Sequence, residues 1–318
     1  MHSGQEGSST HTKVPATPRT IARSIYLGGR LSWGPSWRGR GVMRKAIWTL
    51  VLTGVLLVGM MGISYAITNG VPDGNNHPYV GLVVFDVLNA DGDPVPSHRC
   101  SGSLLTPTVF LTAGHCTDGT VAARVWLDEI VQGNPEYPFS GPSSYDGTPF
   151  TYPGFCIGCG KGLPGFAIGD VGIVILSEPV PTTAVNEYAT LPTVGWSDLL
   201  PNKSGIDQVG YGVQVQIPGG GVPPRLRWTG PRVRLFAPSE IVPGKFVHSS
   251  DFLRIAMNPG GGSGGTCFGD SGGPILDGGT DRVLAVNSYV TNVNCSGVGY
   301  AARIDTDDVL EWIDGFLP

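Results

Sequence analysis

Charged residues and helical periodicity are both scarce in this 318-residue sequence. Only 14% of the residues are charged, whereas 49 are glycine and 27 are proline. No segment shows helical periodicity before residues 305–317, which argues against a helical protein and favours a turn-rich β protein. Hydrophobic residues make up 41% of the chain, enough to build a core, so extended disorder is also excluded.

Basic residues are few after position 66. The first 66 residues carry eight Lys or Arg and one acidic residue; from totals of 20 and 25, the rest of the chain carries 12 basic and 24 acidic residues. Because nucleic-acid binding depends on Lys and Arg contacts to phosphate, this acidic body argues against a nucleic-acid partner.

The change in charge coincides with an apolar run at residues 43–66. This run begins with Arg44 and Lys45 and ends on Ser64 and Ala66, the small residues of a signal-peptide cleavage site. We therefore predict a signal peptide and secretion or periplasmic export; the alternative is a membrane anchor, since the run is long enough to span a bilayer. Residues 1–42 are then either a disordered tail or an over-extended reading frame.

From residue 67 onward, short apolar runs alternate with turn signals. Predicted strands lie in 77–87, 101–114, 123–131, 170–176, 233–237 and 282–290, and predicted turns in 89–94, 140–149, 217–224 and 258–265. The last segment, 305–317, predicts a helix capped by Asp305 or Thr306. Many short strands and one terminal helix indicate an all-β barrel or sandwich.

The stretch GGTCFGDSGGPIL (264–276) raises the question of whether Ser271 is a nucleophile. Gly269, Ser271 and Gly273 also fit the G-x-S-x-G elbow of α/β-hydrolases, but that fold needs a histidine after the serine. All histidines precede Ser271, so the elbow is excluded and a His, Asp, Ser order remains open. The six are His2, His11, His77, His98, His115 and His248.

Four segments together resemble the trypsin/chymotrypsin family of serine proteases. They are RCSGSLL (99–105), LTAGHCTDG (111–119), GDVGIVIL (169–176) and CFGDSGGP (267–274), in the family's order and at family-like separations. The resemblance covers residues 67–318. It implies two antiparallel β-barrels of six strands, about 67–185 and 186–304, a C-terminal helix at about 305–317, and an active site between the barrels.

The resemblance assigns a role to each candidate residue. Ser271 attacks the substrate carbonyl, His115 transfers the proton, and Asp170 orients the imidazole. The backbone N–H groups of Gly269 and Ser271 form the oxyanion hole. Gly172 stands where the family commonly has alanine.

The resemblance also implies how the chain is activated. A free Ile67 amine pairs with Asp270, because Asp270 buried without a cation would be costly. ITNG (67–70) departs from the family's usual start but keeps the isoleucine. No Lys or Arg stands at the cleavage point directly before Ile67, where Ser64, Tyr65 and Ala66 lie instead, so we expect cleavage after Ala66 to expose Ile67 directly, without a separate propeptide.

Six cysteines after an export signal indicate disulfides. By resemblance, Cys100 pairs with Cys116 and Cys267 with Cys295. That leaves Cys156 and Cys159, a C-x-x-C pair without a βαβ context or a second ligand pair. We interpret it as a local disulfide and expect no metal.

The specificity pocket is also inferred by resemblance. Its floor matches Gly265 and Thr266, so the aspartate of a trypsin-like pocket is absent. Ser288 is expected to hydrogen-bond Asp170, and the stretch from Ser288 to Val290 to pair with substrate backbone. Val290 and Val298 narrow the walls, which predicts small aliphatic residues before the scissile bond.

The sequence thus predicts a monomeric, secreted serine endopeptidase without cofactor, acting on peptides or proteins. The alternative is a catalytically silent homologue that acts as a binding module. A membrane-tethered protease is a third reading, if residues 43–66 stay uncleaved.

Overall fold

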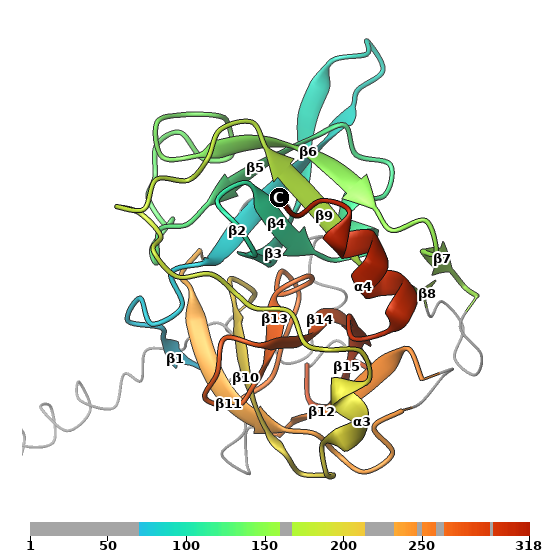
Figure 1. Cartoon of the computed structure of the whole chain (residues 1–318). Helices are drawn as coiled ribbons and strands as arrows, with labels where there is room; N and C mark the ends of the chain where they lie inside the picture. Colours follow the sequence, from blue (N-terminus) through green and yellow to red (C-terminus); the bar gives the residue numbers. More distant parts are fainter. Residues whose placement is uncertain (1–69, 160–166, 214–231, 247–249, 259–263, 293–294) are drawn as a thin grey trace, which may run out of the picture. The chain divides into compact units, whose positions relative to one another are not determined.

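The computed structural model describes one folded part of the chain (Figure 1). The chain divides into two compact units, 1–62 and 63–318, and every described residue belongs to the second. The predicted segments 1–42 and 43–66, Ile67, and most of the turns predicted at 217–224 and 258–265 lie outside the described residues. No described helix is long and apolar enough to cross a membrane. The described residues are 70–159, 167–213, 232–246, 250–258, 264–292 and 295–318.

The first half of the described chain forms a closed antiparallel barrel. Around the barrel the strand order is β2-β3-β4-β9-β6-β5, so no strand is left with an unpaired edge. The strands are rich in buried valine, leucine and phenylalanine and enclose much of the main core. Their bounds are β2 (Val80–Leu88), β3 (Pro94–Leu104), β4 (Val109–Thr112), β5 (Ala122–Trp126), β6 (Tyr145–Thr151) and β9 (Gly172–Leu176).

Strand β6 begins inside the turn predicted at 140–149, so that prediction was wrong for residues 145–149. The segment pairs with β5 on one side and β9 on the other, with Tyr145 opposite Val125 and Phe150 opposite Ile173. Gly147 suits this place because a Cβ there would lie 2.6 Å from Val174 Cγ1. Pairing on both sides outweighs the local turn preference of its glycine and proline.

The second half forms a seven-stranded sheet with the order β1-β11-β10-β13-β14-β15-β12. The sheet curls until Ile241, after β11, forms an isolated bridge with Ile255 of β12. It is therefore a nearly closed half-barrel, and the expectation of a second six-stranded barrel needs this correction. Its strands are β1 (Val71–Pro72), β10 (Gly205–Gly210), β11 (Leu235–Glu240), β12 (Phe252–Met257), β13 (Pro274–Asp277), β14 (Val283–Val290) and β15 (Gly297–Arg303).

The predicted C-terminal helix is confirmed as α4 (Asp307–Asp314), which begins after Thr306. Its Trp312 ring lies 5.4 Å from that of Tyr152, centroid to centroid, so the helix packs beside the barrel (Figure 1). Asp307 and Asp308 lie in its first turn, where their negative charges interact favourably with the positive end of the helix dipole. The remaining elements are short: α2 (Gly114–Thr117), α3 (Trp196–Leu199), β7 (Cys156–Ile157) and β8 (Ala167–Ile168).

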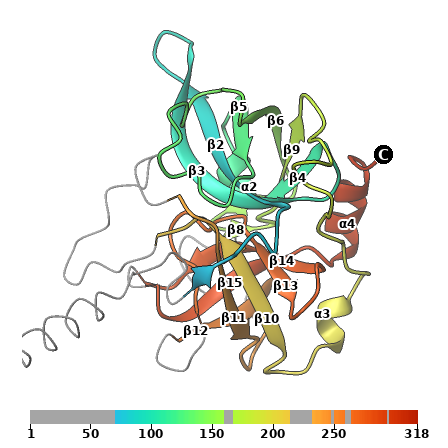
Figure 2. The ribbon, with the colours of Figure 1, turned by 90° about the vertical axis from the view of Figure 1, so that its left-hand side faces the viewer.

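Arg234, which is fully buried, ties the barrel to the seven-stranded sheet. Its Nη1 donates to the carbonyl oxygens of Val80, at 2.9 Å, and Leu127, at 3.0 Å, while its Nε donates to Asp73 at 3.0 Å. Figure 2 shows the barrel lying above the sheet, with α4 at the side. These buried hydrogen bonds of a charged guanidinium group hold the barrel against the seven-stranded sheet. The candidate active site lies where the barrel and the sheet meet.

Candidate active site

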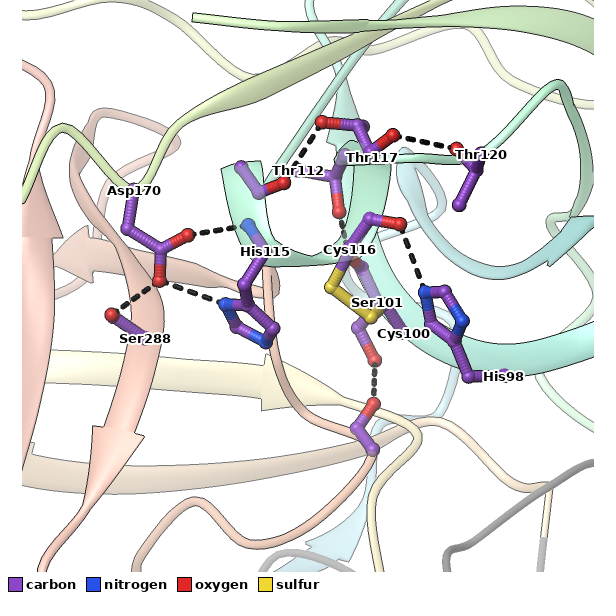
Figure 3. Close-up of a disulfide and its surroundings, with 12 residues drawn as sticks. His98, Cys100, Ser101, Thr112, His115, Cys116, Thr117, Thr120, Asp170 and Ser288 are labelled. Atoms are coloured by element: carbon purple, nitrogen blue, oxygen red, sulfur yellow. Dashed lines mark hydrogen bonds and ion pairs between the residues drawn. A yellow bond between two sulfur atoms is a disulfide. The ribbon is translucent and has the colours of Figure 1, made fainter. Parts of the chain in front are cut away.

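His115 stands on the one-turn helix α2, directly after β4. The Cys100–Cys116 disulfide connects this helix to β3, with a sequence separation of 16 residues (Figure 3). The His115 side chain is 32% exposed, so one side of the ring is covered and the other can meet a substrate. The two sulfur atoms beside it are bonded to each other and are not thiolate ligands for a metal.

Asp170 lies just before β9 and is 1% exposed. One carboxylate oxygen accepts the backbone N–H of His115 at 2.7 Å. The other oxygen accepts from His115 Nδ1 at 2.8 Å and from the Ser288 hydroxyl (Figure 3). With Nδ1 as the donor, Nε2 is the ring nitrogen left to act as a base.

The glycine that departs from the family pattern also has a structural reason. A Cβ on Gly172 would lie 2.7 Å from Thr117 Cγ2 and 2.8 Å from the Ala113 carbonyl oxygen. Glycine therefore allows β9 to pass close to helix α2, which keeps Asp170 beside His115.

Asp170 and His115 shift each other's pKa in opposite directions. Burial disfavours the imidazolium, but the charge of Asp170 and its hydrogen bond outweigh burial and raise the pKa of His115. Burial likewise opposes ionisation of Asp170, but the charge and hydrogen bonds of His115 and the hydroxyl of Ser288 lower its pKa. The pair therefore favours an ionised carboxylate beside a histidine that holds a proton readily.

Ser101 of β3 holds the loop that contains Ser271. Its backbone N–H donates to the Ser271 carbonyl oxygen at 2.8 Å, and its hydroxyl donates to the Gly269 carbonyl oxygen at 2.9 Å. Ser101 is fully buried and follows Cys100, so the barrel strand and its disulfide support the loop. The sequence motifs do not single out Ser101, because a serine one residue after a cysteine carries no local signal.

Gly269 and Ser271 leave their backbone N–H groups available. Neither N–H makes a hydrogen bond with another residue of the described ranges, and the Ser271 hydroxyl makes none either. Gly269 has a backbone φ of +99°, a conformation that residues other than glycine rarely adopt. Two free N–H groups beside a serine hydroxyl can receive a developing negative charge.

Asp270 is completely buried behind Ser271. Its carboxylate accepts the backbone N–H groups of Gly212 at 2.7 Å and Cys267 at 2.9 Å. Burial raises its pKa to about 7, although these hydrogen bonds and the charge of nearby Arg99 act in the opposite direction. Ile67, its expected partner, lies outside the described residues.

His115 and Ser271 line the same pocket, which has a volume of about 230 Å³. Thr266, Ser288 and Val290, expected in the specificity pocket, line it as well. Gly265 packs against Met257 instead, and Val298 lies in β15 opposite Ala256; neither lines this pocket. The full lining is His115, Thr266, Cys267, Phe268, Ser271, Asn287, Ser288, Tyr289 and Val290.

Asn287 is a lining residue that the sequence reasoning missed. It follows the apolar run VLAV in β14 and is only 3% exposed. A polar residue just before Ser288, in a strand expected to meet the substrate, was the available signal.

The described cysteines form three disulfides. Cys267–Cys295 lies beside the pocket, because Cys267 is one of its lining residues. Cys156 and Cys159 are bonded to each other near β7, before Asp170. No cysteine is left free among the described residues.

A barrel and a curled sheet, with an Asp–His pair and a serine meeting at one pocket between them, define the class of chymotrypsin-like proteins. Comparison with known proteins gives the family: the chain belongs to the trypsin family of serine peptidases, whose model, described as Trypsin, matches residues 72–313.

Curated relatives are similar at low identity. Chymotrypsin-like elastase family member 3B of Macaca mulatta is 26% identical over 212 residues, covering 63% of this chain and 74% of the relative. Proproteinase E of Bos taurus is 26% identical over 244 residues, covering 71% of this chain and 87% of the relative.

Solved structures support the fold. HL collagenase superposes with a TM-score of 0.57 at 18% identity, covering 78% of this chain and 97% of that chain. Human heparin binding protein superposes with a TM-score of 0.52 at 15% identity, covering 79% of this chain and 96% of that chain. At these identities the likeness shows the fold alone.

Proposed function

We propose that this chain is a serine endopeptidase that cleaves peptide bonds through an acyl-enzyme. The observation that carries the proposal is the Asp170-held His115 at the same pocket as Ser271. Serine is a weak nucleophile unless a base accepts its proton, and a base is effective only when it is oriented. Asp170 supplies that orientation through both its carboxylate oxygens.

The proposed reaction begins when Ser271 Oγ attacks the substrate carbonyl carbon while its proton passes to His115 Nε2. The carbonyl oxygen becomes an oxyanion near the free N–H groups of Gly269 and Ser271. His115 then gives the proton to the leaving amine as the C–N bond breaks, leaving an ester on Ser271. Water, deprotonated by His115, hydrolyses that ester and restores the serine.

The residue before the scissile bond is proposed to be small and uncharged. No acidic side chain is among the described residues that line the pocket, so a lysine or arginine side chain would be buried beside them without a counter-charge. Val290 on the wall favours small aliphatic residues, and three of the similar curated relatives are named chymotrypsin-like elastases.

Export and activation complete the proposal. Three disulfides fit an oxidising compartment, which supports secretion. We propose that the amine of Ile67, freed by cleavage after Ala66, pairs with buried Asp270. A cation there would offset the burial that raises the pKa of this carboxyl group to about 7. N-terminal sequencing of secreted protein tests this step, and a mature start other than Ile67 would contradict it.

Hydrolysis of a peptide panel tests the activity. Peptides with Ala, Val, Lys, Arg or Phe before the cut are incubated with the mature protein and with Ser271→Ala. Cleavage after the small residues, abolished in the variant, is expected. Cleavage after Lys or Arg would refute the pocket assignment, and no cleavage by protein beginning at Ile67 would favour a silent binding homologue.

A further inference from the structure

Asn287 brings a buried carboxamide to the wall of the pocket. It lies in β14, lines the pocket and is 3% exposed. The next residue, Ser288, donates its hydroxyl hydrogen bond to Asp170. Asn287 is thus one residue away from the catalytic pair, on the strand proposed to meet the substrate.

The backbone groups of Asn287 are already used. Its N–H donates to the Gly273 carbonyl oxygen at 2.9 Å, and its carbonyl oxygen accepts the Gly272 N–H at 2.7 Å. These bonds hold the strand against the loop that follows Ser271. The position of the side chain in the pocket wall is therefore set by the main chain.

The side chain of Asn287 has no hydrogen-bond partner among the described residues. Both Nδ2 and Oδ1 are buried, and neither makes a hydrogen bond with a described residue. Leaving a buried donor and a buried acceptor unsatisfied costs free energy, so buried amides are normally paired. Because Asn287 is also a lining residue of the pocket, a group that enters the pocket is the candidate for the missing partner.

Thr266 provides a second polar side chain on the same pocket. It is also 3% exposed, and its hydroxyl makes no hydrogen bond with a residue in the described ranges. It comes from the segment before Ser271, whereas Asn287 comes from β14. The pocket therefore holds hydrogen-bonding groups from two separate parts of the fold.

A charged ligand group does not suit this pocket. The described lining residues include no Asp, Glu, Lys or Arg, and Cys267 is in a disulfide, so His115 is the one basic side chain among them. A carboxylate or ammonium group would be desolvated there without a permanent counter-charge. A neutral group that both donates and accepts hydrogen bonds matches a carboxamide and a hydroxyl better.

We propose that Asn287, together with Thr266, makes the pocket select an uncharged hydrogen-bonding side chain, a hydroxyl or a carboxamide, before the scissile bond. The inference rests on the proposed peptidase function and refines its substrate class. Within the small uncharged residues, it ranks threonine above valine and asparagine above leucine, unlike the aliphatic preference expected from Val290 alone.

Peptides that differ only at this residue test the ranking. Threonine and valine are nearly equal in shape, as are asparagine and leucine, so each pair isolates the hydrogen bonds. For the mature protein, kcat/KM is expected to be at least about tenfold higher for threonine than for valine, because valine leaves the pocket's polar groups unpaired. Asn287→Leu is expected to abolish or reverse this ratio, whereas Asn202→Leu, an exposed asparagine elsewhere, leaves it unchanged.

A binding measurement separates this inference from the proposed function. Product peptides ending in threonine or valine are titrated into Ser271→Ala protein, which needs no turnover. Tighter binding of the threonine peptide by at least about tenfold, lost in Ser271→Ala/Asn287→Leu, supports the inference even if catalysis fails. Equal binding, preference for valine, or no binding of either peptide overturns it, and the melting temperature of each variant confirms that it is folded.

Discussion

Replacing Asp170 with asparagine would test how the His115–Asp170 pair works. The substitution keeps the size of the side chain and removes its charge. In the structure the carboxylate accepts three hydrogen bonds, from the His115 backbone N–H, from His115 Nδ1 and from the Ser288 hydroxyl. An amide has one oxygen and one NH₂ group, so it cannot accept on both sides.

Either orientation of the asparagine leaves a conflict. If its oxygen accepts the His115 backbone N–H, its NH₂ group faces Nδ1, and the ring must carry its proton on Nε2. That tautomer cannot take a proton from Ser271. If the amide is reversed, its NH₂ group faces the backbone N–H, and two donors meet in a buried place.

The expected loss in kcat for Asp170→Asn is about 10⁴-fold, the size found when a triad histidine is held in the wrong tautomer. This corresponds to about 5 kcal/mol in the activation free energy. The fold should lose less, about 1–3 kcal/mol, because hydrogen bonds to a charged group are replaced by poorer ones.

The pH dependence gives a second readout. His115 must be neutral to act as a base, so kcat/KM falls as pH drops through the pKa of this histidine. Burial lowers that pKa, but Asp170 outweighs burial and raises it. With the charge removed, burial remains, and the acidic limb of the variant is expected at lower pH than that of the parent.

Steady-state hydrolysis of one peptide from pH 5 to 9 measures both effects, with active-site titration to count competent molecules. Asp118→Asn is a matched control, because Asp118 is an exposed carboxylate just after the same short helix. The reasoning is refuted if Asp170→Asn retains more than a tenth of the parental kcat, or if its acidic limb moves to higher pH.

Three further predictions concern stability. Gly272→Ala should cost about 3 kcal/mol or more, because φ is +78° and the new Cβ would lie 2.2 Å from Thr112 Oγ1; an unchanged melting temperature would contradict this. Replacing Cys100 and Cys116 together with alanine should cost about 3 kcal/mol in denaturant unfolding, since the disulfide closes a separation of 16 residues, and a loss below about 1 kcal/mol would count against it. Burial raises the pKa of Asp270 from 3.8 to about 7, so in a chain with an uncut N-terminus the folded state binds a proton on this carboxyl group more tightly than the unfolded state does. The contribution of that proton to the free energy of unfolding is full below about pH 4 and is lost as pH rises through 7. Unfolding titrations from pH 4 to 8 should show that decline, and Asp270→Asn should flatten it; a flat parental profile would refute the assignment.

Much of the fold and of the candidate site can be predicted from short sequence motifs. The motif TAGHC holds the candidate catalytic histidine next to its disulfide cysteine, and the motif GDSGGP holds the candidate serine next to its supporting glycines, so each can be read from a few neighbouring residues. The apolar run after Asp170 predicts a strand, and the structure forms β9 from Gly172 to Leu176. The terminal helix is predictable for the same reason, since its apolar residues repeat at helical spacing.

Other features depend on partners far away in the chain. Strand β6 looks like a turn because its glycine and proline favour turns locally, and only pairing with β5 and β9 makes it a strand. The second sheet does not close into a full barrel, and its two ends are joined only by the isolated bridge between Ile241 and Ile255. The local sequence pattern does not predict this arrangement either.

The sequence by itself determined the family and the identity and chain order of the candidate catalytic residues, a histidine, an aspartate and a serine. Only the tertiary structure decided that Ser101 of the barrel holds the Ser271 loop, that Arg234 joins the two halves, and that the Asn287 side chain, at the pocket wall, finds no hydrogen-bond partner in the described part of the chain. The physical reason is that a motif records chemistry within a few neighbouring residues. Burial and hydrogen-bond satisfaction also depend on residues far away in the chain, such as Ser101 and Gly269, which are 168 positions apart.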